Sequence, residues 1–349
     1  MPARLIKAYH YGPLRLKGGR SVRCLIIHNA RSGFGSSAVF EFERALIRGG
    51  DECTLRVLAQ DETAEHAARD AKDYDLVVLS GGDGTTTSLL YALRNRDVLA
   101  CVFPSGTANL FCINVGNAPE PAAMARACRI GRSAVTDLGE VTYQTTDGKS
   151  HTRGFSIMMG TGFDAQIMQD AVAGKQVLGE AAYFGAALSN AFPDVHHFKI
   201  TVDGKTYERD GISCLVANNA TIQGDIHIVP DARMDDGMLD VIVLEQQNAV
   251  GLLKPIIAAL SEREGTYLGR PQIESFRGRH VRVEPTEPGP LEYDGETDGE
   301  LVTSYEARVL PRANRVVVDG LSPYRNPADP HSEKHPRFGE AEVAAYPTL

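Results

Sequence analysis

The chain has 349 residues, enough for two domains that each bury a hydrophobic core. Its 43% hydrophobic and 23% charged residues are an ordinary globular mixture, and its net charge of −9 argues against general nucleic-acid binding, which needs a clustered basic face. The six cysteines lie far apart without a C-x-x-C pair, so we expect free thiols in a reducing cytoplasm and neither disulfides nor zinc.

Residues 1–20 are expected to form a basic arm, because they carry five lysines or arginines and no acidic residue. Two interpretations of this arm stay open: a solvated extension, or a contact with anionic lipid headgroups. We expect neither a signal peptide nor a transmembrane helix, since the best apolar stretch, 250–260, is short and is interrupted by Lys254 and Pro255. A lipid substrate would therefore be reached from the aqueous side.

Strands and helices alternate over residues 21–135. Buried-strand patterns occur at 23–29, 53–59, 74–80 and 98–104, and helical periodicity occurs at 36–48, 63–72 and 86–96. Such alternation predicts a parallel sheet that is covered by helices on both faces. This part of the chain is therefore predicted to be an α/β domain.

Short strands dominate residues 136–310. They are expected at 138–144, 152–160, 198–203, 212–218, 239–245, 280–284 and 305–310, with helices at 164–173, 179–191 and 248–262. The pattern predicts a second, mainly antiparallel domain with helices attached. Residues 323–349 are rich in proline and polar side chains, so we expect a loosely ordered, flexible tail.

The strongest local signal is the glycine-rich segment 80–85, "SGGDGT", between a predicted buried strand and a predicted helix. Backbone N–H groups and a helix N-terminus at such a position bind phosphate, and glycines let the backbone approach it closely. Asp83 would repel a phosphate, so its expected role is to bind Mg²⁺ or to orient a water or hydroxyl group.

Two further loops, 29–36 and 104–109, follow neighbouring strands of the same predicted sheet. Ligands of open α/β sheets bind outside the carboxyl ends of the strands, so the three loops can converge on one nucleotide. The candidate nucleotide-binding residues are Asn29, Ser32, Gly33, Gly81, Gly82, Asp83, Gly84, Thr85, Gly106, Thr107 and Asn109.

The motifs "HNARSG", "GGDGT" and "PSGTAN", in this order and spacing, resemble the diacylglycerol kinase catalytic family, which includes bacterial lipid kinases, sphingosine kinases and ceramide kinases. The resemblance runs from about residue 21 to 322, through "GTGFDA" (160–165), the segment 218–241 and "EYDGE" (292–296). It implies an ATP- and Mg²⁺-dependent kinase that phosphorylates a hydroxyl of a membrane lipid: ceramide, a sphingoid base or diacylglycerol. The implied protein is cytoplasmic and associates peripherally with membranes, and a second copy of the chain is a candidate partner.

The resemblance also implies the architecture. We expect an α/β fold with an N-terminal Rossmann-like nucleotide domain (21–135) that contains a parallel sheet. A C-terminal, mainly antiparallel β-sandwich-like lipid domain (136–310) would follow, with a cleft between the two. Residues 311–322 would return to the first domain.

By position in the resemblance, Asp294 is the catalytic base that accepts the proton of the lipid hydroxyl, and Glu296 helps to place Mg²⁺ or to orient the base. A second Asp-Gly-Glu, 298–300, offers an alternative, but spacing from the preceding strand favours Asp294. Asp235 and Asp236, with a carbonyl near Arg233, resemble a structural Mg²⁺ site. A tight turn explains that segment equally well, and both interpretations stay open.

Two departures from the family pattern bear on substrate and activity. Ala30 stands where the family usually has proline, and Leu110 stands where bacterial diacylglycerol kinases have an aspartate. Because sphingosine kinases also have a non-acidic residue there, Leu110 favours a sphingoid base or ceramide, and it leaves a weakly active or inactive protein open. Two other classes stay open: an NAD kinase-like enzyme that shares the G-G-D-G loop, and a non-catalytic lipid- or nucleotide-binding module.

Overall fold

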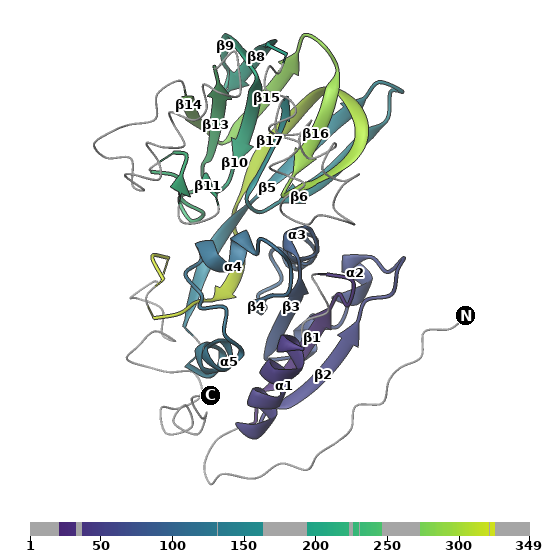
Figure 1. The fold of residues 1–349 in the computed structure, drawn as a ribbon, viewed down its shortest axis with the longest axis vertical. Coiled ribbons are helices and arrows are strands. Elements are labelled where there is room, and N and C mark those ends of the chain that lie inside the picture. Colours follow the sequence, from purple (N-terminus) through teal and green to yellow (C-terminus); the bar gives the residue numbers. More distant parts are fainter. Residues whose placement is uncertain are drawn as a thin grey trace. The chain divides into compact units, whose positions relative to one another are not determined.

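The computed structural model describes most of the two predicted domains (Figure 1). The described residues are 21–32, 37–130, 132–162, 194–222, 226–229, 231–245, 273–320 and 322–324. The basic arm, the tail from residue 325 and the helices expected at 164–173, 179–191 and 248–262 lie outside these residues. The chain divides into two compact units: unit 1 comprises residues up to Thr136 and again from Arg312, and unit 2 comprises Asp137–Pro311.

Unit 1 contains the expected parallel sheet. Its strands lie in the order β2 (Glu52–Val57), β1 (Arg23–His28), β3 (Leu76–Gly81) and β4 (Leu99–Pro104), all parallel. The C-terminal end of β17 (Glu296–Val317) adds a fifth parallel strand beside β4. All six residues of β3 are buried, as the uninterrupted apolar run predicted.

The helices of unit 1 are α1 (Ala38–Arg48), α2 (Ala64–Ala67), α3 (Asp83–Leu93), α4 (Leu110–Asn114) and α5 (Pro121–Ile130). Phe42 of α1 packs on Phe103 of β4 with ring centroids 4.8 Å apart, which fixes this helix against the sheet. The helix expected to begin at residue 86 begins at Asp83, with Gly82 as its N-cap. The glycine-rich loop therefore leads directly into a helix N-terminus.

The prediction of one helix over 63–72 was wrong, because the structure has a shorter helix there. Only Ala64–Ala67 is α-helical, and Ala71–Asp73 forms a 3₁₀ turn. Arg56 donates to the carbonyl of Ala67 and forms a two-bond ion pair with Asp70 at 2.7 Å, and Arg96 donates to the carbonyl of Ala68 at 3.0 Å. Because these carbonyls would accept the next helical hydrogen bonds, the two arginines end the helix early.

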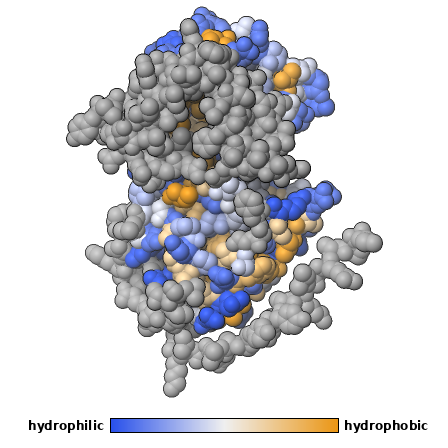
Figure 2. Space-filling view, viewed as in Figure 1, coloured by the Kyte–Doolittle hydropathy of each residue, from blue (hydrophilic) through white to orange (hydrophobic). Residues whose placement is uncertain are grey.

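Unit 2 is built almost entirely from antiparallel strands, as predicted. One run of neighbours is β14-β13-β10-β7-β16-β17, and β17 continues through β15 and β8 to β9. The strands are β5 (Ser133–Thr145), β6 (Ser150–Phe155), β7 (Met158–Gly162), β8 (His196–Val202), β9 (Lys205–Gly211), β10 (Ser213–Ala217), β13 (Leu239–Leu244), β14 (Ile273–Gly278), β15 (His280–Pro285) and β16 (Gly289–Tyr293), with the short pair β11 (Thr221–Ile222) and β12 (Ile226–His227). The β8–β9 hairpin exposes charged side chains, and the upper margin of Figure 2 is accordingly largely blue.

Three features of unit 2 differ from expectation. The single strand expected at 152–160 is two strands, β6 and β7, which are separated by Ser156 and Ile157. Strands β9, β14 and β16 were not anticipated, and β17 has 22 residues where 305–310 was expected. The break between β6 and β7 results from contacts in the candidate active site that are described below.

Gly139 of β5 provides a test of the packing in unit 2. It pairs with Phe155, and a Cβ at Gly139 would lie 2.0 Å from Cζ of that buried ring. We therefore expect Gly139→Ala to lower the free energy of unfolding by about 1–3 kcal/mol, because the ring must leave its rotamer. Chemical denaturation measures this loss, and a midpoint equal to that of the wild type would contradict the packing described.

Candidate active site

The loops that follow β1 and β3 are bonded to each other in unit 1. The Gly82 N–H donates to Ser32 Oγ at 3.1 Å, and Asn29 Nδ2 donates to Thr85 Oγ1 at 2.8 Å. Both bonds join the end of β1 to the glycine-rich loop and the first turn of α3. The two loops thus meet at the carboxyl edge of the sheet.

The loop that follows β4 closes against the same glycine-rich segment. A Cβ at Gly106 would lie 2.5 Å from Gly82 Cα, so only a glycine permits this approach. Asn109 has a positive φ of 52° and bonds Gly106 in both directions, at 2.7 Å to its N–H and 2.8 Å to its carbonyl. The three loops therefore converge, as the strand order predicted.

Asp83 is the first residue of α3. Its Oδ1 accepts the backbone N–H of Phe111 in α4 at 3.2 Å. A helix N-terminus favours the negative charge of a carboxylate, and Asp83 lies in the first turn of α3 next to the loop amides. Gly84 lies in the same helical turn, Thr107 is an exposed residue of the loop after β4, and Gly33 lies outside the described residues.

A chain of polar side chains below the loops was not predicted from the sequence. His28 Nδ1 lies 2.9 Å from Ser80 Oγ, which lies 2.7 Å from Ser105 Oγ. Burial lowers the pKa of His28, so its imidazole is neutral near pH 7. These three hydrogen-bonded side chains connect the ends of β1, β3 and β4 and fix the spacing of the loops that follow these strands.

Unit 2 places Asp294 in the turn of the β16–β17 hairpin. Asp294 and Gly295 have positive φ values of 48° and 81°, and Tyr293 pairs with Glu296 across the turn. A two-residue turn of this kind favours Asp-Gly, because both residues are left-handed. The buried Glu292 accepts the N–H of Gly295 and was not singled out in the sequence.

The carboxylate of Asp294 accepts four hydrogen bonds from the gap between β6 and β7. Oδ2 accepts the N–H of Ser156 at 2.7 Å and its hydroxyl at 3.1 Å, and Oδ1 accepts the N–H groups of Ile157 at 2.9 Å and Met158 at 3.1 Å. These donors turn toward Asp294, which explains why the expected strand is broken there. The four hydrogen bonds hold the Asp294 carboxylate in one orientation.

The other predicted acidic residues near the hairpin lie in different settings. Glu296 is the exposed first residue of β17. Asp298 lies in a bulge of the same strand and contacts Arg153 at 2.8 Å, so it does not share the turn of Asp294.

Arginines neutralise the acidic residues that resemble a structural Mg²⁺ site. Arg233 forms two hydrogen bonds with Asp235, at 2.7 and 2.9 Å, and Arg277 contacts Asp236 at 2.7 Å and Asp240 at 3.2 Å. Within the described ranges, no three acidic, histidine or cysteine side chains gather where they could hold a metal ion. Because arginines already pair with these carboxylates, the donor set does not fit Mg²⁺, which proteins usually hold through one or two carboxylates and water.

Comparison with known families covers both units. Residues 23–141 match the diacylglycerol kinase catalytic domain, and residues 157–318 match the YegS C-terminal NAD kinase beta sandwich-like domain. The chain belongs to the diacylglycerol kinase catalytic-domain family. This membership makes it a lipid kinase by family, with the α/β and β-sandwich-like domains that the resemblance implied.

Several bacterial proteins are similar to this diacylglycerol kinase family member. A protein named diacylglycerol kinase from Bacillus subtilis is 27% identical over 294 residues, which cover 80% of this chain and 91% of that protein. A Pseudomonas aeruginosa protein named "Probable lipid kinase YegS-like" is 29% identical over 279 residues, covering 78% and 86%. The fold matches a solved diacylglycerol kinase from Bacillus anthracis at a TM-score of 0.66 and 19% identity, over 85% of this chain and 97% of that one.

Proposed function

We propose that this lipid kinase transfers the γ-phosphate of ATP to the hydroxyl of a neutral membrane lipid, with diacylglycerol as the first candidate. The observation that carries the proposal is the convergence of three glycine-containing loops at the carboxyl edge of a parallel sheet in the family's catalytic domain. That edge is where open α/β sheets bind ligands. The names of the bacterial relatives favour diacylglycerol as the acceptor.

The residues of unit 1 fit a triphosphate. Among the residues that the structure describes, a Cβ at Gly82 would meet only Gly106 Cα, at 3.7 Å, and it would meet no other described atom on that side. The amides at the start of α3 and the helix N-terminus supply donors and partial positive charge to a phosphate. Asn29 Nδ2 and the Thr85 hydroxyl are hydrogen-bonded to each other at 2.8 Å, and both can instead donate to phosphate oxygens.

Asp83 is the residue of unit 1 that we assign to Mg²⁺. When bound, Mg²⁺ offsets the negative charge of the phosphates and so permits attack by a neutral hydroxyl. The carboxylate lies at the start of α3, and one of its oxygens accepts the Phe111 N–H. It therefore offers a hard oxygen ligand beside the loop amides.

Asp294 is assigned to the acceptor hydroxyl. Three backbone N–H groups fix its carboxylate, and when the Ser156 hydroxyl turns away from Oδ2, that oxygen can accept a hydrogen bond from the lipid hydroxyl in a defined direction. Phosphoryl transfer through a loose transition state needs positioning more than a strong base, so the proton can pass to Asp294 late. The exposed Glu296, two residues along, is assigned to placing Mg²⁺ or orienting Asp294.

A sphingoid base or ceramide is the second candidate acceptor, and Leu110 favours it. Leu110 begins α4 immediately after Asn109, where bacterial diacylglycerol kinases carry an aspartate. None of the helices in the described part of the chain is long and apolar enough to cross a bilayer. We propose that the protein reaches its lipid by peripheral contact with a membrane surface.

The test is phosphate transfer from γ-labelled ATP and Mg²⁺ to a detergent-dispersed panel of diacylglycerol, ceramide, sphingosine, phosphatidylglycerol and NAD. Label in diacylglycerol supports the first candidate, and label in ceramide or sphingosine supports the second. Label in NAD alone would overturn the assignment of a lipid acceptor.

A further inference from the structure

β17 contains a bulge directly after the Asp294 hairpin. Pro290 pairs with Leu301 and Glu292 pairs with Thr297, so one residue of β16 faces the three residues 298–300 of β17. Gly299 has a positive φ of 71°, which a glycine adopts without strain. A bulge re-aims the side chain that it carries, and here that side chain is Asp298.

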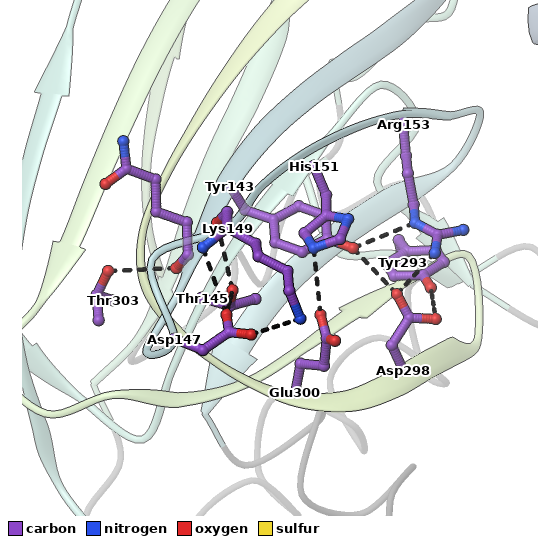
Figure 3. Close-up of polar contacts among 11 residues, drawn as sticks. Tyr143, Thr145, Asp147, Lys149, His151, Arg153, Tyr293, Asp298, Glu300 and Thr303 are labelled. Atoms are coloured by element: carbon purple, nitrogen blue, oxygen red, sulfur yellow. Dashed lines mark hydrogen bonds and ion pairs between the residues drawn. The ribbon is translucent and has the colours of Figure 1, made fainter.

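Asp298 accepts hydrogen bonds from three side chains, which belong to the strands β16, β5 and β6 (Figure 3). Its Oδ1 accepts the phenol of Tyr293 at 2.5 Å, and its Oδ2 accepts the phenol of Tyr143 at 3.0 Å and Nη2 of Arg153 at 2.8 Å. Arg153 Nε also donates to the Tyr143 oxygen at 3.2 Å, and its guanidinium lies 5.1 Å from the centre of the Tyr293 ring. Hydrogen bonds to an ionised acceptor are the stronger kind, so this cluster is held in one arrangement.

Tyr293 connects the cluster to Asp294. It precedes Asp294 in the chain, it is buried, and it pairs with Met159 of β7 on one side and Glu296 of β17 on the other. Burial, and then the hydrogen bond to Asp298, raise the pKa of Tyr293, so its phenol remains a donor at any physiological pH. The phenol thus fixes the residue directly before the turn.

We propose that Asp298 and Tyr293 are positioning residues for Asp294: the β17 bulge aims Asp298 at Tyr293 and thereby sets where the Asp294 carboxylate lies. The proposal rests on the proposed function for its kinetic consequence, but its structural consequence stands without it. Reacting groups lose about 100-fold in rate when they are misplaced by about 1 Å, so a loosened hairpin costs rate more than binding.

The experiment compares Tyr293→Phe and Asp298→Asn with the wild type in two measurements. Amide resonances of Ile157 and Met158, whose N–H groups donate to Asp294, report the position of the carboxylate. Turnover of the lipid acceptor, with the KM for ATP, reports the chemistry. We expect both amides to shift in both variants, kcat to fall roughly tenfold, and the KM for ATP to stay within twofold.

Glu300→Gln is the matched control. Glu300 lies in the same bulge, is similarly exposed, and contacts His151 at 3.6 Å and not the tyrosines (Figure 3). We expect this variant to leave the two amides and kcat unchanged. If Glu300→Gln and Asp298→Asn changed the amide resonances and kcat equally, the loss of a surface charge alone would explain both variants. That result would overturn the proposal.

Arg153→Lys keeps the positive charge but removes the Nε–H that binds Tyr143, so it should move the amides less than Asp298→Asn does. Unmoved amides in Tyr293→Phe and Asp298→Asn would overturn the positioning role even if turnover fell. Amides that shift in a protein that phosphorylates no lipid would instead support the positioning role and refute the proposed function.

Discussion

Asp294→Asn should lower kcat by about 10³-fold while ATP affinity stays within about twofold of the wild type, because a positioned base contributes about 10²–10⁴-fold. The substitution removes the negative charge and one acceptor. Oδ1 faces two N–H groups and Oδ2 faces an N–H and a hydroxyl, so the new amide NH₂ must face at least one donor. Steady-state turnover and calorimetric ATP binding measure the two effects.

The same mismatch of donors should cost stability, about 1–3 kcal/mol for a polar group that loses its partner. Turnover is therefore compared at a temperature where unfolding curves show both proteins folded. Asp235→Asn is the control: this carboxylate belongs to the same unit and pairs with Arg233, and its loss should leave kcat and the Mg²⁺ dependence unchanged. A kcat for Asp294→Asn within threefold of the wild type would contradict the role assigned to Asp294.

Gly82→Val should weaken ATP binding by roughly 100-fold or more without unfolding the protein. Gly82 has an extended backbone (φ −78°, ψ 178°), which valine adopts readily, and a Cβ there meets, in the described part of the chain, only Gly106 Cα at 3.7 Å. The side chain therefore fits the protein but fills the side of the loop that is open to a phosphate, and displaces the charge-assisted hydrogen bonds made there. Calorimetry measures the ATP affinity, and thermal unfolding confirms that the variant is folded.

Gly106→Ala provides the contrast. Its Cβ would lie 2.5 Å from Gly82 Cα, so the loops after β3 and β4 must separate and the unfolding temperature should fall. Val at position 82 should therefore cost binding, and Ala at position 106 should cost stability as well. Full ATP affinity in Gly82→Val would place the phosphates elsewhere.

Local sequence patterns predicted the parts of the fold that depend on burial alone. The uninterrupted apolar runs of β1, β3 and β4 predicted central parallel strands, and their order predicted that the loops after them meet. The start of α3 was placed three residues late because Gly84 and three threonines, which are weak helix formers, fill its first turns. Capping by Gly82 and the position beside β3 outweigh those weak propensities.

The parts that sequence could not predict depend on contacts between distant residues. Nothing in the apolar alternation of 152–160 indicates that three amides turn toward a carboxylate 136–138 positions away. β17 extends beyond the expected 305–310 on both sides, because the chain accommodates "TDGE" in a bulge at 298–300 and "PRAN" with a positive φ of 55° at Arg312. The ends of helix α2 were likewise set by Arg56 and Arg96 from other elements.

The candidate site was predicted unevenly for the same reason. Motif residues such as Gly82, Gly106 and Asp294 stand out in the sequence. Their supporting partners do not: Ser156 lies in no motif, and His28 and Glu292 begin the motifs "HNARSG" and "EYDGE" without a sign of their role. Asp235 and Asp236 show the reverse case, since their spacing suits a cation but Arg233 and Arg277 occupy them. Spacing along the chain carries no information about such neutralising partners.

The most direct test of lipid phosphorylation is a single-turnover reaction of excess enzyme with γ-labelled ATP, Mg²⁺ and dispersed diacylglycerol, run in parallel with ceramide and with sphingosine. We expect labelled lipid phosphate to appear in an amount equal to the ATP consumed. We expect Gly82→Val and Asp294→Asn each to suppress it. ATP that binds to the wild-type protein but transfers no label to diacylglycerol, ceramide or sphingosine would contradict the proposed function.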